Sequence, residues 1–145
     1  MMQTPPISTD RFSGLPSRDL LLIAVCSDKG DPDPICSWAR ELVRLHRARE
    51  EFPDTATVCD CRRGEAIRQI TELACAAEPS ATVARSIGLL IDRIAAAAER
   101  AMRYLAAFGA GSEQMHAAWT TLAELELEYS DLISGRFDPR ERAPS

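Results

Sequence analysis

Histidine and cysteine are the side chains of this chain that most readily bind metal ions, and the sequence holds two histidines and five cysteines. Cys59 and Cys61, with Cys75, His46 and His116, would supply enough nitrogen and sulfur ligands for a tetrahedral zinc site. Residues two apart on a helix point about 200° away from each other, so Cys59 and Cys61 cannot both bind one ion within a helix. We therefore predict no metal site and no cofactor, and interpret the cysteines as structural. Redox sensing is the alternative, because two arginines follow Cys61 and a neighbouring positive charge favours the reactive thiolate.

A second group of side chains suits the binding of a small molecule. His46 lies beside the apolar stripe of a predicted helix, with Arg49 three residues further on, and a polar pocket is expected there. Asp92 and Arg93 lie on a longer predicted helix, and Tyr129 lies on the last one. These five residues are the ligand-binding candidates. For Tyr129 the competing interpretation is a core anchor, because it recurs at helical spacing among leucines.

Evidence for an enzyme is weak. The phrase Ile91-Asp92-Arg93-Ile94 is similar to one that opens a long helix in all-helical chorismate mutases. The spacing of later arginines does not fit that enzyme, and a matching lysine and glutamine are lacking. No glycine-rich phosphate loop, Ser-His-Asp order or His-Glu-x-x-His motif is present either. We therefore predict no catalytic residues and favour a non-enzymatic protein, with an enzyme as the alternative that the sequence leaves open.

Arg40, Arg44 and Arg47 form a basic stripe on the helix that carries His46. Such a face suits an anionic ligand or an acidic partner. The structural interpretation is that it packs against the last helix, where residues 112–134 contain acidic side chains and no basic ones. We favour the structural interpretation, because complementary charged faces commonly line packed helices.

The elements that must position these residues are predicted to be helices, because the apolar side chains recur every three or four residues. Helix starts are expected near Ser17, at Asp33 with Pro34 in the first turn, and at Ser112, and stops at the glycines after residues 108 and 134. No segment alternates apolar and polar residues for long enough to predict a strand. The fold class is all-α, an antiparallel bundle of four main helices plus a short N-terminal helix. The expected helices are 20–25, 34–50, 57–77, 83–108 and 113–133.

One domain accounts for the 145 residues. We expect a flexible arm over 1–14, a helical domain over 15–136 and a flexible tail over 137–145. The chain holds 17 basic and 22 acidic residues, with an isoelectric point near 5.1, which disfavours nucleic-acid binding. No signal peptide and no membrane-spanning run are expected. An odd number of irregularly spaced cysteines is typical of the cytoplasm.

Three stretches of the sequence resemble an uncharacterised actinobacterial helical family, domain of unknown function 4254. They are Leu42 to His46, Ser86 to Ala95, and His116 to Trp119 continuing at Tyr129 to Arg136. The similarity would cover about Leu15 to Arg136, and the sequence departs from the family pattern at Cys61. The resemblance implies a bacterial helical protein and supplies no activity.

The function predicted from the sequence is a non-enzymatic interaction or accessory module in the bacterial cytoplasm, with a protein partner of unknown identity. The alternative is a small-molecule-binding or catalytic helical bundle that uses His46, Arg49 and Asp92. We also predict a homodimer formed through the long helix over 83–108. Its many alanines, at 95–98, 101, 106 and 107, would let a second helix approach closely.

Overall fold

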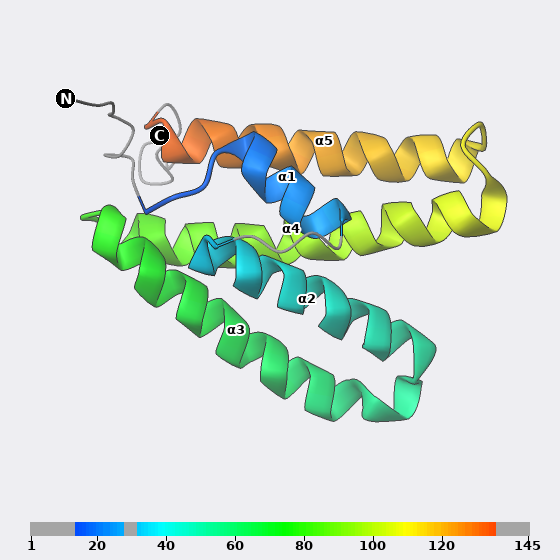
Figure 1. Cartoon of the computed structure of the whole chain (residues 1–145), viewed down its shortest axis with the longest axis horizontal. Coiled ribbons are helices and arrows are strands. Elements are labelled where there is room, and N and C mark those ends of the chain that lie inside the picture. Colours follow the sequence, from blue (N-terminus) through cyan, green and yellow to red (C-terminus); the bar gives the residue numbers. More distant parts are fainter. Residues whose placement is uncertain (1–13, 28–31, 136–145) are drawn as a thin grey trace, which may run out of the picture.

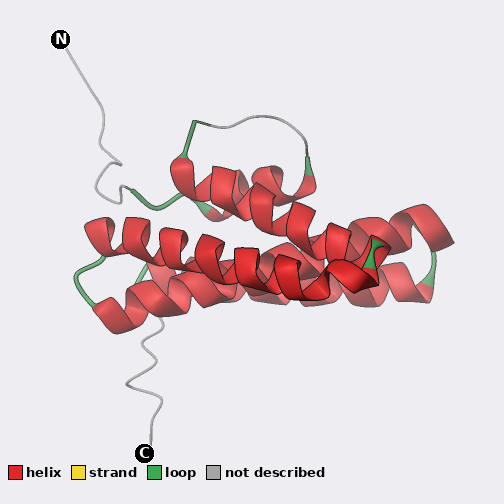
Figure 2. Cartoon of the chain, turned by 90° about the horizontal axis from the view of Figure 1, so that it is seen from below, coloured by secondary structure: helices red, strands yellow, loops and turns green. Residues whose placement is uncertain are grey.

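The computed structural model describes residues 14–27 and 32–135, and within these ranges the chain is all-α with no strand (Figures 1 and 2). This confirms the predicted fold class. Most of the arm over 1–14 and all of the tail over 137–145 lie outside the described residues. No helix within residues 14–27 and 32–135 is both long enough and apolar enough to cross a membrane. The helices are α1 (Arg18–Cys26), α2 (Pro34–Glu51), α3 (Ala56–Ala77), α4 (Ala81–Phe108) and α5 (Glu113–Ile133), with a 3-10 turn η1 (Pro53–Thr55) after α2.

Side-chain caps fix where the helices begin. Ser17 accepts a hydrogen bond from the backbone N–H of Leu20 at 3.1 Å, and Asp33 and Ser112 cap α2 and α5 in the same way, as predicted. Ser80 caps α4, which the sequence analysis missed. The chain leaves α4 at Gly109, whose φ of 88° lies in the left-handed region that suits a residue without a Cβ.

The long helix α4 is the centre of the molecule. It packs against each of the other four helices, whereas α5 contacts only α4 and α1 among the described elements. Figure 1 shows α5 on one side of α4 and the α2–α3 pair on the other. The basic stripe of α2 therefore does not pack against the acidic α5, and the structural interpretation of that stripe was wrong. The periodicity of α2 and α5 defines their faces but contains no information about which helices become neighbours.

The alanines of α4 are used mainly inside the chain. Ala95, Ala98 and Ala101 have no exposed surface, and Ala97 is 7% exposed. Only Ala96, Ala106 and Ala107 of the predicted contact surface retain appreciable exposure. Most of the small side chains on which the predicted dimer depended are therefore covered by the protein's own helices.

Gly88 marks a close approach of α3 to α4. A Cβ at this position would clash with the side-chain oxygen of Thr71 and lie 3.2 Å from the carbonyl oxygen of Ile67. Gly88 is thus a packing residue that lets the two helices meet closely. This approach also brings the N-terminal half of α3 alongside α4, where the polar residues of the candidate site lie.

Candidate functional site

A cluster of charged side chains lies where α2, α3 and α4 meet. At its centre is Asp92 of α4, which is only 8% exposed. Its Oδ1 lies 2.9 Å from Nε2 of His46 on α2, and its Oδ2 accepts a hydrogen bond of 2.9 Å from Nη2 of Arg63 on α3. Nε of Arg63 donates a further bond of 3.3 Å to Oδ1. One buried carboxylate therefore joins three helices.

The cluster continues outward through a second carboxylate. Nη1 of Arg63 donates to Oδ1 of Asp60 at 2.9 Å. Arg49 binds the same carboxylate with two nitrogens, Nε to Oδ1 at 3.0 Å and Nη2 to Oδ2 at 3.3 Å. The side chains thus alternate between nitrogen donors and carboxylates along the row His46, Asp92, Arg63, Asp60 and Arg49, which we call the polar chain. Bidentate arginine–carboxylate pairs of this kind hold each guanidinium in one orientation.

Asp92 is a stronger acid than an ordinary aspartate. Burial disfavours its charged form, but the hydrogen bonds from His46 and Arg63 outweigh this effect and leave its pKa below the usual value. The pKa of Arg63 is raised, chiefly by its hydrogen bond to Asp92. The pKa of Asp60 is lowered, chiefly by its hydrogen bond from Arg49. Asp92 is therefore ionised at neutral pH.

The ionised Asp92 fixes the proton position on His46. A carboxylate only accepts hydrogen bonds, so Nε2 of His46 must carry the proton that points to Asp92. In the neutral ring, Nδ1 is then the nitrogen with a free lone pair, and it has no partner among the described residues. His46 can therefore accept a proton at Nδ1, and its protonated form can donate a hydrogen bond to an anion.

A small pocket of about 200 Å³ lies next to the polar chain. Four arginines and one histidine line it, against two glutamates. Glu99 is buried, and its carboxylate is paired with Nε of Arg103 at 3.2 Å. The lining side chains alone therefore have more cations than anions, although the Asp60 and Asp92 carboxylates that bind Arg49 and Arg63 offset this difference. Its residues are His46, Arg49, Glu50, Arg63, Ala96, Glu99, Arg100 and Arg103.

The structure brings together three of the five ligand-binding candidates, His46, Arg49 and Asp92. Arg93 follows Asp92 on α4 but points elsewhere: its side chain is 61% exposed and lies 4.0 Å from Glu128 of α5. Tyr129 is fully buried in the core, where its hydroxyl donates a hydrogen bond of 2.7 Å to the carbonyl oxygen of Pro16. Arg93 and Tyr129 therefore do not belong to this site.

Asp60, Arg63, Glu99 and Arg103 were not among the ligand-binding residues predicted from the sequence. For Arg63 a signal was present, because it lies four residues after Cys59 and three before Ala66, two buried residues of α3. An arginine in the buried stripe of a helix requires a buried carboxylate on a neighbouring helix. Asp92 is that carboxylate, but only the packing of α3 against α4 identifies it.

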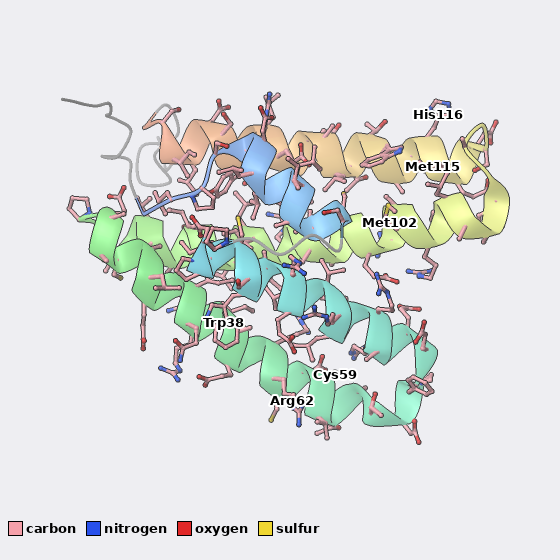
Figure 3. All side chains as sticks on the ribbon, in the orientation of Figure 1. Trp38, Cys59, Arg62, Met102, Met115 and His116 are labelled. Atoms are coloured by element: carbon pink, nitrogen blue, oxygen red, sulfur yellow. The ribbon has the colours of Figure 1, made fainter. Side chains whose placement is uncertain are left out.

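The cysteines are separated as helical geometry requires. Cys59 and Cys61 both lie in α3, the first buried and the second exposed, and all five cysteines are free thiols. Figure 3 shows Cys59 on α3 and His116 on α5, on opposite sides of α4. Within residues 14–27 and 32–135, no three histidine, cysteine, aspartate or glutamate side chains are grouped so as to hold a metal ion.

Comparisons with protein-family models, with curated proteins and with solved structures found no match to this chain. The resemblance to domain of unknown function 4254 stays a prediction.

Proposed function

We propose that this protein binds a small anionic ligand, a carboxylate or a phosphate, in the pocket beside His46. The observation that carries the proposal is the lining of that pocket, in which arginines held by Asp60 and Asp92 adjoin a histidine with one free ring nitrogen. Of the two functions suggested by the sequence, small-molecule binding has the stronger structural support.

The lining supplies the donors that an anion requires. Guanidinium groups bind carboxylate and phosphate oxygens through paired N–H donors. The two aspartates hold Arg49 and Arg63 in place before any ligand arrives, so little side-chain entropy is lost on binding. His46 adds a donor at Nδ1 once it is protonated.

The size and chemistry of the pocket favour binding over covalent catalysis. Its volume of about 200 Å³ is smaller than the roughly 300 Å³ or more of pockets that enclose drug-sized ligands, which indicates a compact ligand. None of the side chains that line it is a serine, threonine or cysteine able to act as a nucleophile. We therefore propose a binding module rather than an enzyme.

Calorimetric titration with inorganic phosphate and with small dicarboxylates tests this proposal. Arg49→Gln removes a lining cation and should weaken binding about tenfold, the loss of one charge-assisted hydrogen bond. Arg68→Gln is the control, because Arg68 lies exposed on α3, pairs with Glu65 and Glu72 and does not line the pocket. Equal binding by both variants, or no heat with any anion at millimolar concentration, would refute the proposal.

The interaction-module hypothesis is the second candidate, and one observation favours it. Among the described elements α5 contacts only α4 and α1, so part of its length is available to a partner. We propose that the partner is a second copy of the chain, as predicted from the sequence, although the buried alanines of α4 are not the contact.

The free thiols suit a reducing compartment, which supports a place in the bacterial cytoplasm.

A further inference from the structure

A groove runs between α4 and α5, and no residue of α1, α2 or α3 lines it. Its volume is about 340 Å³. We call it the α4/α5 groove. The residues that line it are Arg93, Ala96, Ala97 and Arg100 from α4, and Thr121, Glu124, Leu125 and Glu128 from α5.

The two walls of the α4/α5 groove have opposite charge. The α4 wall carries Arg93 and Arg100, and the α5 wall carries Glu124 and Glu128. Arg93 and Glu128 lie 4.0 Å apart with both side chains well exposed, at the outer limit of an ion pair. Arg100 and Glu124 make no ion pair with any described residue. The charges along the groove are therefore largely available to a partner.

The floor of the groove allows a partner to approach closely. Of the two alanines that line it, Ala96 is the partly exposed one, and it places only a methyl group between the two charged walls. Leu89 lies one turn before Arg93 on the same strip of α4 and is 46% exposed. A partner that covers this strip would bury apolar surface between its charged contacts.

We infer that the α4/α5 groove is where two copies of this chain meet, with the two-fold axis parallel to the groove. Such an axis places α4 of one copy opposite α5 of the other and keeps each residue at the same height along the groove. Because Arg93 and Glu128 are already neighbours within one chain, Arg93 of each copy then faces Glu128 of the other. The basic wall meets the acidic wall twice, once on each side of the axis.

The charge pattern excludes the other two-fold arrangement. An axis in the interface plane but perpendicular to the groove would place α4 opposite α4 and α5 opposite α5. Two arginine rows would then face each other, as would two glutamate rows. Like charges placed opposite one another disfavour association. The opposite charges of the two helices therefore select the arrangement with the axis parallel to the groove.

Charge reversal tests this inference, which rests on the self-association proposed above. In the inferred dimer, Arg93→Glu places two glutamates opposite each other at both symmetric contacts, and Glu128→Arg places two arginines there. Each variant alone should therefore elute as a monomer near 15.9 kDa in size-exclusion chromatography with light scattering. An equimolar mixture should form a heterodimer of twice that mass, because both contacts then pair opposite charges in each direction. The double variant R93E/E128R should dimerise alone.

The possible failures have different meanings. A monomeric wild-type chain at tens of micromolar would overturn both the self-association and the inferred interface. A wild-type dimer that survives both single variants, or variants whose mixture stays monomeric, would overturn the interface alone. Circular dichroism melts check that each single variant is folded, and the double variant shows whether position 93 tolerates glutamate. Neither Arg93 nor Glu128 lines the pocket beside His46, although Ala96 and Arg100 line both that pocket and the groove.

Discussion

Replacement of Asp92 by asparagine should destabilise the protein by about 2 kcal/mol at neutral pH. Asparagine keeps the shape of the side chain but removes the charge that holds Arg63 and His46. Breaking a fully buried ion pair by changing one partner costs roughly 3–5 kcal/mol. The cost here is lower, because the Arg63 side chain is 26% exposed and also binds Asp60.

Urea denaturation at neutral pH measures the change directly, as a shift of the midpoint at constant m-value. A double-mutant cycle with Arg63→Met isolates the coupling between Asp92 and Arg63, and we expect roughly 1–2 kcal/mol. Glu41→Gln is the control, because Glu41 pairs with Arg44 on the exposed surface of one helix and should contribute less than about 0.5 kcal/mol.

The destabilisation caused by Asp92→Asn should also depend on pH in a defined direction. The pKa of Asp92 is lower in the folded protein than in the unfolded chain, where it is about 3.9. The ionised carboxylate therefore stabilises the fold fully above that value, and this stabilisation is lost as the pH falls toward the lower folded pKa. The difference between wild type and variant should therefore shrink once the pH drops below about 4. A coupling energy no larger than that of the surface control, or a difference independent of pH, would refute the polar chain as a link between helices.

Three further predictions concern other positions. Gly88→Ala should lower the free energy of unfolding by about 2 kcal/mol, because the added methyl group forces α3 away from α4. Gly64→Ala should raise it by about 1 kcal/mol, because Gly64 lies at an exposed position of α3 where a methyl group meets open space. Urea denaturation of both variants tests this pair. Burial raises the pKa of Glu126, whose Oε2 has no partner among the described residues, so its charge opposes folding as pH rises. Glu126→Gln should therefore stabilise the protein by about 1 kcal/mol at neutral pH and less near pH ~4; a loss of stability would contradict this. Cys61 and Cys75 should react with a thiol reagent before the other three cysteines, as mass spectrometry of partly labelled protein can check.

The sequence was sufficient for the helices because the signals that define them are local. Asp33 and Pro34 begin α2, Ser112 begins α5, and Gly109 ends α4, each through contacts within a few residues. Apolar spacing then identified most of the buried residues of α4 and α5, whereas at the start of α3 the apolar residues Val58 and Cys61 are exposed. The start of α4 at Ser80 was missed although a serine is a common cap, because the apolar periodicity begins only at Val83.

The sequence also identified part of the site. His46 and Arg49 were found together because they share one helix. Asp92 was named with them, yet nothing in the sequence linked its carboxylate to the ring of His46, 46 positions away. Arg93 was chosen with Asp92 because the two are consecutive, but adjacent helical residues point about 100° apart, and the two side chains face different neighbours.

Only the tertiary structure decided which faces meet. Gly88 lets α3 approach α4 closely, and this approach brings Arg63 to Asp92 and completes the polar chain. The same packing leaves α2 and α5 without contact, so the complementary charges that suggested a pair never meet within one chain. Helical periodicity specifies the face that each helix buries, whereas the choice of neighbour depends on how all five helices fill space together. That choice created the pocket and left the α4/α5 groove uncovered by α1, α2 and α3.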